Sequence, residues 1–441
     1  KEAALKKEKV LVFGDYDIDG ITSTAIMLLT LKSMGINAYY YLPDRITEGY
    51  GFSVHGIKEA IKRRASLIIT VDCGSSALKE IEEASSHGID VIITDHHLPP
   101  ETLPEALAVI NPHRADSIYP FRELSGAGVA FKLSQALLGE KAEELIWLAS
   151  IGTIGDLVPL LGENRTITYL GLKRINSTHS IPISALKESI GIYGDIDSST
   201  LSYKIIPKLN AIGRFIRADK AVELFITHDI NKARSIAQEL GEINKKRRDL
   251  GEAIYYSALK KLEQYGIDGV IVLSCDTWHP GIIGIVASRL VEEFYRPTFL
   301  FAIDNGVARG SARSIPSFHL CEALNKCKDM LLSYGGHSQA AGIHIPSEKI
   351  ECFREKMNNI IKESLRSEDL IPKIQLDITS TLDELNKNIA KEIMRLEPFG
   401  QSNHPPLIGA KNLEIMYASV VGSGHLKMGL RQNGVILDSI G

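Results

Sequence analysis

Short apolar runs alternate with segments of helical periodicity between residues 10 and 111 of the sequence. The runs lie at residues 10–13, 38–42, 67–71, 91–94 and 108–110. Strands that alternate with helices favour a parallel, doubly wound sheet, because each helix carries the chain back to the edge from which the next strand starts. The sequence therefore predicts an α/β domain built on a parallel sheet.

The rest of the chain changes its pattern several times, and at about 150 residues per domain its length suggests roughly three domains. Asp229 can cap a long helix, rich in Lys and Glu, that runs to about Tyr265. Beyond it we expect a second α/β unit with strands up to residue 311 and helices up to about residue 365. The expected divisions are a first domain at 1–228, a connecting helix at 229–266, a second α/β domain at 267–369 and the start of a β-rich domain, cut short, at 370–441.

Composition excludes several classes of protein. The 50 basic and 54 acidic residues leave a net charge of −4, so any site for a polyanion must be local. No apolar stretch approaches the ~20 residues that a membrane-spanning helix needs, and no Gly-Lys-Ser/Thr phosphate loop occurs. The five cysteines form no Cys-x-x-Cys pair, which is typical of a reducing compartment. We therefore expect a cytoplasmic protein with no contact to membranes and no nucleotide cofactor.

Acidic and histidine side chains follow three of the predicted strands. Asp15, Asp17 and Asp19 follow the first strand, Asp72 follows the third, and the fourth ends in the triplet Asp95, His96 and His97. Ligands gather beyond the carboxyl ends of parallel strands, so all seven side chains are expected to meet in one crevice. The alternative for each cluster is local, because Asp commonly caps a following helix or forms a turn.

A mixed set of carboxylates and imidazoles without thiolates suits Mn²⁺ or Mg²⁺, and so many acids suggest two ions. Paired metal ions are typical of enzymes that hydrolyse phosphoesters. Asp95 has a second interpretation, in which it holds a histidine tautomer instead of binding metal. A further acid, Asp156, lies in a Gly-rich turn after a helical pattern, where the residues alone favour a capping role.

Basic residues suggest where phosphate could bind. Residues 204–220 carry five basic side chains against one acid, and Arg214 stands just past a glycine, where a guanidinium could grip phosphate oxygens. Ser311 and Arg313 alternate on one face of a predicted strand. The basic run 245–248 is flanked by acids, which favours a solvated face over contact with DNA.

Taken in order, these motifs resemble those of the DHH phosphoesterase superfamily. The matching residues are Asp15-x-Asp17-x-Asp19-Gly20, Asp72, Asp95-His96-His97 and Asp156. The segment 335–342, Gly-Gly-His-Ser-Gln-Ala-Ala-Gly, resembles the signature of the DHH-associated domain. Within the superfamily the chain most resembles the RecJ family, bacterial exonucleases specific for single-stranded DNA, through segments such as 207–214 and 278–287. The end of the chain resembles the start of that family's oligonucleotide-binding (OB) domain.

The resemblance implies a DHH-type parallel-sheet domain joined by a long helix to a DHH-associated α/β domain. It implies that Asp15, Asp17 and Asp72 hold one ion and that Asp19, Asp72, His96 and Asp156 hold the other. His97, beside Asp95, would contact the scissile phosphate or help to protonate the leaving group; a supporting role behind the ligands is its alternative. The terminal 5′ phosphate would be bound by Arg45, Arg214, Ser311 and Arg313, and His337 could reach the substrate from the second domain.

The function that follows as an expectation is a metal-dependent 5′-to-3′ exonuclease on single-stranded DNA, acting in DNA repair and recombination and releasing 5′ mononucleotides. Its expected partners are single-stranded DNA with a 5′ end, a single-strand-binding protein and a helicase. One alternative is a DHH phosphodiesterase that acts on cyclic or short oligonucleotides. Another is a non-catalytic replication scaffold, which the complete set of acids opposes.

Overall fold

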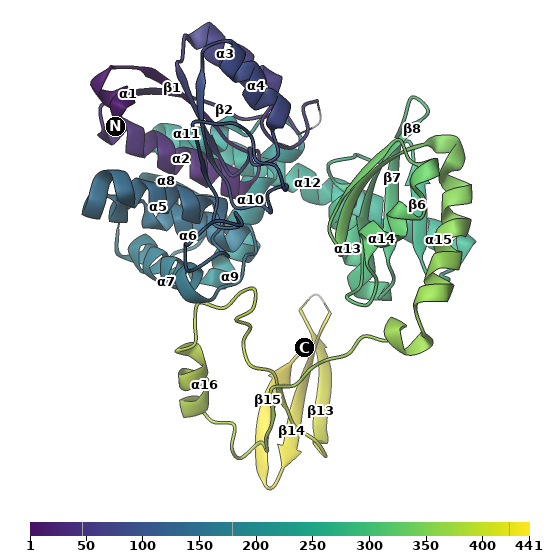
Figure 1. Ribbon diagram of the computed structural model, residues 1–441. Helices are drawn as coiled ribbons and strands as arrows, with labels where there is room; N and C mark the ends of the chain where they lie inside the picture. Colours follow the sequence, from purple (N-terminus) through teal and green to yellow (C-terminus); the bar gives the residue numbers. More distant parts are fainter. Residues whose placement is uncertain (46, 179, 423) are drawn as a thin grey trace.

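The computed structural model describes residues 1–45, 47–178, 180–422 and 424–441. The first domain is built on a five-stranded parallel sheet with the order β2-β1-β3-β4-β5 (Figure 1). A short helix α1 (Glu2–Leu5) precedes the sheet, whose strands are β1 (Lys9–Phe13), β2 (Asn37–Tyr41), β3 (Leu67–Val71), β4 (Asp90–Thr94) and β5 (Ala108–Ile110). The expected α/β domain with a parallel sheet is confirmed.

Both faces of this sheet are buried, which explains why its strands are almost continuously apolar. Val10 and Val12 of β1 pack into one core with the helices on that side, and Leu11 and Phe13 pack into a second core on the opposite face. The helices of the first face include α2 (Ile18–Ser33) and α5 (Gly126–Leu138), and those of the opposite face are α3 (Val54–Arg63) and α4 (Leu78–Ser86).

The order of the strands creates the place for a site. From β1 the chain passes to β2 on one side, and then to β3 on the other side of β1. Where the order reverses in this way, the loops at the carboxyl ends of neighbouring strands diverge and leave a crevice. The loop that starts at Asp15 and the residue Asp72 come soon after β1 and directly after β3, so both lie at this switch point.

A helical half completes the first domain (Figure 1). Its helices are η1 (Gly139–Leu145), α6 (Ile146–Gly155), α7 (Gly162–Ser177), α8 (Ile181–Ile190), α9 (Ser198–Thr200), η2 (Leu201–Ile205), α10 (Ile206–Asn210), η3 (Ile212–Arg214) and α11 (Asp219–Ile226). Helix α6 is buried over residues 146–154 and packs against α2. Its end therefore delivers Asp156 to the same region as the loop after β1.

The long helix α12 (Ile230–Tyr265) joins the two α/β domains, as Figure 1 shows. The side chain of Asp229 accepts hydrogen bonds from the N–H groups of Asn231 and Lys232, so the expected cap is present. The first half of α12 buries Ala233 and Leu240 in the core of the first domain, and the second half buries Ile254 and Leu262 in a core of the second. Because each half packs on a different domain, the helix fixes how the two domains face each other.

The second domain holds a mixed sheet with the order β6-β7-β8-β10-β9, in which β6 and β7 pair in parallel and the other neighbours pair antiparallel. Its strands are β6 (Ile271–Cys275), β7 (Thr298–Asp304), β8 (Val307–Arg313), β9 (Ser333–Gly336) and β10 (Ala340–Pro346), and its helices are α13 (Ile283–Phe294), α14 (Leu320–Asn325), η4 (Lys328–Met330), η5 (Ser347–Lys349), α15 (Ile350–Ser364) and η6 (Ser367–Leu370). The expectation of helices alone between residues 312 and 365 was wrong. Ala341, Ile343 and Ile345 are buried at alternate positions, which is the period of a strand.

The chain ends in a small β-rich region. Its elements are β11 (Ile378–Thr379), α16 (Lys387–Met394), β12 (Ile408–Gly409), β13 (Glu414–Val421), β14 (His425–Gln432) and β15 (Val435–Ile440). The last three strands form an antiparallel sheet whose β13 is exposed along nearly its whole length. No helix in the described part of the chain is both long enough and apolar enough to cross a membrane.

Candidate metal centre and phosphate-binding cluster

The loop after β1 is held tightly, so its three carboxylates have fixed positions. Asp17 caps α2, because its Oδ1 accepts hydrogen bonds from the N–H groups of Asp19 (3.0 Å) and Gly20 (3.2 Å). A Cβ on Gly20 would lie 2.6 Å from the backbone of Asp15, so only glycine allows this turn. Asn210 of α10 accepts a hydrogen bond of 2.8 Å from the N–H of Ile18 and secures the loop from the other side.

Two more carboxylates come from separate elements. Asp72 is 2% exposed and has a left-handed backbone with φ +62°, which turns it sharply away from β3. A Cβ on Gly126 would lie 2.4 Å from Oδ1 of Asp72, so this glycine makes room for the carboxylate. Asp19 accepts hydrogen bonds from the N–H groups of Gly126 (2.6 Å) and Ala127 (2.8 Å) at the start of α5. The same helix start therefore orients one carboxylate and accommodates another.

His96 lies at the centre of the group. Its Nε2 is 3.2 Å from Oδ1 of Asp72, 3.5 Å from Oδ2 of Asp156 and 3.7 Å from Oδ2 of Asp19. Burial and the charge of His97 lower the pKa of His96 to about 3, so its imidazole is neutral at pH 7 and can offer a lone pair.

The buried carboxylates repel each other. Burial, followed by the charges of neighbouring carboxylates, raises the pKa of Asp15, Asp72 and Asp156 well above the usual range and that of Asp19 to about 7. Several of their atoms are buried without any hydrogen-bond partner in the described chain: both carboxylate oxygens of Asp15, Oδ1 of Asp72, Oδ2 of Asp156 and Nε2 of His96. Such groups are costly unless a cation lies among them.

The geometry of these ligand atoms fits two divalent ions. Among the described residues, three groups have ligand atoms within 4.8 Å of one another: Asp15, Asp17 and Asp72; Asp19, His96 and Asp156; and Asp72, His96 and His97. The first two groups correspond to the two sets implied by the family resemblance, and Asp72 adjoins both because it also approaches His96. Oxygen and imidazole ligands without sulfur suit Mn²⁺ or Mg²⁺. Asp156 is thus part of the group and makes no side-chain capping bond to the described residues.

Asp95 does not join any of these groups and instead lies behind His97. Its Oδ1 accepts hydrogen bonds from the N–H groups of both histidines and lies 2.9 Å from Nδ1 of His97, while Oδ2 accepts from the N–H of Ser75. Burial opposes its ionisation, but the hydrogen bond and charge of His97 and the bond from Ser75 lower the pKa of Asp95 to about 2. Burial likewise opposes protonation of His97, yet the contact with Asp95 raises its pKa. Asp95 therefore keeps His97 oriented.

Four arginines gather next to this centre. Burial, then the charges of Arg45, Arg247 and Arg313, lower the pKa of Arg214 to about 10. Arg45 places its guanidinium 5.1 Å from the ring centre of Tyr16, which stands between Asp15 and Asp17 in the chain. We call Arg45, Arg214, Arg247 and Arg313 the arginine cluster.

The second domain contributes to the cluster through β8 and the start of α13. Arg313 donates a hydrogen bond of 3.2 Å from Nη1 to Oγ of Ser311. A Cβ on Gly284 would lie 2.8 Å from that oxygen and 3.2 Å from Nη2 of Arg313, so the glycine opens the space beside both. Arg214 donates to the carbonyl of Gly281 across the domain boundary (2.9 Å).

Arg247 is the member that sequence analysis missed. The expectation of a solvated face was wrong for it, because its Nε is buried and has no hydrogen-bond partner in the described chain. Its neighbours differ: Lys246 lies over the ring of Phe215, while Lys245 and Arg248 line a cavity on another face of α12. These four basic residues differ in the face of α12 on which they lie. The acids that flank them in the sequence do not indicate that face.

His337 is not brought into either group. It lies exposed between β9 and β10, and its N–H donates to the carbonyl of Ala340 at 2.8 Å. None of its hydrogen bonds within the described residues reaches the metal centre, so its contact with substrate stays a prediction.

Comparison with known proteins covers the whole chain. Residues 9–155 match the DHH family, N-terminal domain; residues 268–363 match the DHHA1 domain; and residues 376–441 match the RecJ OB domain. The single-stranded-DNA-specific exonuclease RecJ of Bacillus subtilis is 41% identical over all of this chain, which spans 57% of that relative's length. The protein of the same name from Haemophilus influenzae is 35% identical, again over all of this chain and over 81% of the relative.

Solved structures give the same result. RecJ from Thermus thermophilus in complex with Mn²⁺ matches all of this chain and 69% of its own, with a TM-score of 0.85 and 30% identity. An exonuclease RecJ bound to manganese matches 85% of this chain and 94% of its own, with a TM-score of 0.72 and 35% identity. These likenesses in sequence, in domain order and in fold show that the chain belongs to the RecJ family of DHH phosphoesterases.

Proposed function

We propose that this chain is a metal-dependent exonuclease that degrades single-stranded DNA from its 5′ end and releases 5′ mononucleotides. One observation carries the proposal: a buried set of carboxylates and one imidazole lies directly beside the arginine cluster. The carboxylates and the imidazole match two Mn²⁺ or Mg²⁺ ions in charge and ligand type, and the arginine cluster matches the negative charge of a terminal phosphate. The relatives' names and their manganese and magnesium complexes support this activity.

In this proposal Asp15, Asp17 and Asp72 hold one ion, and Asp19, Asp72, His96 and Asp156 hold the other. When bound, the ions supply positive charge to the phosphoryl oxygens and activate water. The protein's own residues fix the geometry, because the start of α5 orients Asp19 and the cap of α2 orients Asp17. His97, kept in place by Asp95, contacts the scissile phosphate or gives a proton to the 3′ oxygen that leaves when the P–O bond breaks.

The arginine cluster accounts for polarity and product length in this proposal. Arg45, Arg214, Ser311 and Arg313 bind the terminal 5′ phosphate, and the phosphodiester one nucleotide further along then reaches the ions. Tyr16 connects the two places, since its ring contacts Arg45 while its neighbours in the chain are Asp15 and Asp17. A path framed by both domains and α12 admits one backbone, which would exclude duplex DNA.

The cellular context belongs to the same proposal. We expect the enzyme to act in the cytoplasm, in DNA repair and recombination, together with a single-strand-binding protein and a helicase. The family relationship and the sparse cysteines support this context.

The test is digestion of DNA strands labelled at the 5′ or the 3′ end, single or duplex, with Mn²⁺ present. The proposal requires early release of the 5′ label as a mononucleotide from single strands only. Activity confined to dinucleotides or cyclic dinucleotides would instead identify a phosphodiesterase of short substrates. Binding of DNA without any hydrolysis would identify a scaffold.

A further inference from the structure

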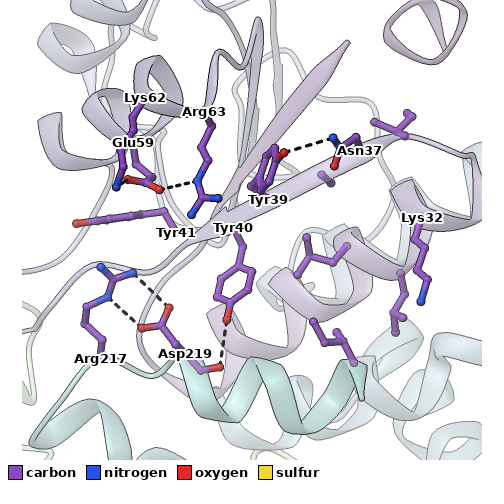
Figure 2. A pocket seen from close by; sticks show the side chains of 15 residues that line it. Lys32, Asn37, Tyr39, Tyr40, Tyr41, Glu59, Lys62, Arg63, Arg217 and Asp219 are labelled. Atoms are coloured by element: carbon purple, nitrogen blue, oxygen red, sulfur yellow. Dashed lines mark hydrogen bonds and ion pairs between the residues drawn. The ribbon is translucent and has the colours of Figure 1, made fainter. Parts of the chain in front are cut away.

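A groove of about 780 Å³ follows the free edge of the first sheet, on β2 (Figure 2). Its walls come from α2, from α3, and from α11 together with Arg217 just before it, with β2 along the middle. None of the residues assigned to the metal centre or the arginine cluster lines it. The groove is therefore a separate feature of the first domain.

The edge of β2 offers unused backbone groups. Gly14 donates its N–H to the carbonyl of Tyr41, so the backbone groups of Tyr41 face β1. Successive residues of a strand direct these groups to opposite sides, and those of Ala38 and Tyr40 therefore face outward. In the described part of the chain nothing pairs with them. Two N–H and two C=O groups of β2 can therefore form backbone hydrogen bonds with one more strand.

Aromatic side chains flank this edge on both faces. Figure 2 shows Tyr39 and Tyr41 on the side of α3 and Tyr40 on the side of Asp219. The hydroxyl of Tyr40 donates to the carbonyl of Asp219 at 3.4 Å, and that of Tyr41 donates to Glu48 at 2.8 Å. These bonds hold the rings in place as walls against which the side chains of an added strand could pack.

The charge of the groove is positive, although the whole chain carries −4. Four cations line it, Lys32, Lys62, Arg63 and Arg217, against the two carboxylates Glu59 and Asp219. The guanidinium of Arg63 lies 4.8 Å from the ring centre of Tyr39, and that of Arg217 lies 4.4 Å from the ring centre of Tyr41. Each cation thus lies against one of the two tyrosine rings on the α3 side of the strand. Both side chains stay partly exposed (46% and 38%), although Arg63 is paired with Glu59 and Arg217 with Asp219.

We propose that this groove binds an acidic, extended peptide segment of a partner protein, which adds to β2 as a further strand. Backbone pairing with Ala38 and Tyr40 supplies affinity, and the flanking Arg63 and Arg217 select acidic side chains. A second copy of this chain fits less well, because two such edges would place like charges against each other. A nucleic acid lacks the alternating N–H and C=O groups that the edge requires.

The test uses a fluorescein-labelled six-residue peptide of alternating Asp and Val, with binding followed by fluorescence anisotropy. The wild-type chain should bind it, and more weakly as salt is raised. The double variant Arg63→Glu/Arg217→Glu should bind at least about tenfold more weakly, because two attractive contacts with the acidic peptide turn repulsive. The matched control Lys173→Glu/Lys260→Glu changes the net charge equally at two exposed lysines on other helices and should bind like the wild type.

Backbone pairing is tested separately from charge. A peptide methylated at alternate backbone nitrogens keeps its charges but loses donors, and it should not bind. Ala38→Pro removes the outward N–H without removing a bond to β1, so it should abolish peptide binding while nuclease activity stays unchanged. Equal binding of the methylated peptide, or no binding of the acidic peptide by the wild type, would overturn the proposal. Displacement of the peptide by an oligothymidylate would show a nucleic-acid surface instead, and dimerisation lost in Ala38→Pro would show a second copy as the occupant.

Discussion

The metal centre and the arginine cluster lie side by side but are assembled in different ways. All the proposed metal ligands come from the first domain, and all except Asp156 lie shortly after strands of one sheet. The arginine cluster draws on the loop after β2, on η3, on α12 and on β8 of the second domain. A site made at the ends of neighbouring strands is fixed by the fold of one domain. The arginine cluster, by contrast, forms only when α12 holds the two domains in this relative position.

The largest expected effect is at the metal centre. Asp72→Ala removes the carboxylate that adjoins both proposed ion positions, and hydrolysis of single-stranded DNA should fall on the order of 10³-fold or more, since the ions contribute several kcal/mol to the transition state. The measurement is the initial rate with saturating Mn²⁺, and binding of labelled single strands serves as the control for folding. A rate within tenfold of the wild type would contradict the metal assignment.

Removing one arginine of the second domain should have a smaller effect that depends on the substrate. Arg313→Gln loses charge-assisted hydrogen bonds of roughly 1.5–3 kcal/mol, so kcat/KM for strands with a 5′ phosphate should fall roughly 10- to 100-fold. Strands with a 5′ hydroxyl lack that phosphate and should change little. An equal loss on both substrates would mean that Arg313 does not bind the terminal phosphate.

The adjacent arginines of α12 test whether the connecting helix takes part in the cluster. Arg247→Gln should raise KM for single-stranded DNA about threefold to tenfold, because one partly buried cation near Arg214 is lost. Arg248→Gln changes the next residue, which lines a different cavity, and should leave KM within about twofold. If the two variants have the same KM, Arg247 does not take part in the arginine cluster.

The smallest effect concerns the stability of the protein without metal. The native carboxyls keep protons that the unfolded chain has already lost, because the folded pKa of Asp19 is about 7 and those of Asp15, Asp72 and Asp156 are raised well above their usual range. Their contribution to stability is therefore complete at low pH and is lost as the pH rises through the folded values. His96 has a folded pKa of about 3, so its contribution makes stability rise with pH. That rise ends at about pH 6.5, the pKa of an unfolded histidine, and does not affect the range above it.

In the presence of a chelator, Tm should thus fall by a few degrees between pH 6.5 and pH 8. The variant Asp19→Asn should show a smaller slope, and Mn²⁺ should raise Tm most at the upper end of the range. Calorimetry at several pH values is the measurement. A chelated protein that becomes more stable as the pH rises would show that the carboxylates are not clustered as described.

Sequence patterns anticipated the metal centre better than the rest of the molecule. The apolar runs marked the five strands, and side chains that follow such strands must meet at one edge of a parallel sheet. Asp156 had no such signal, because only the packing of α6 against α2 brings it to that edge. The antiparallel pair β9 and β10 was missed, since short alternation interrupted by glycines resembles a loop.

The sequence by itself determined which chemistry is available: carboxylates and imidazoles after strand ends, an excess of basic residues at 204–220, and Ser311 and Arg313 on one face of a strand. Periodicity acts over a few residues, so it specifies these local elements and the edge to which they point. Tertiary structure alone decided that Arg247 turns inward while Arg248 does not, that Asp95 supports His97, and that the edge of β2 stays open. Those outcomes depend on contacts between segments far apart in the chain, which no local pattern encodes.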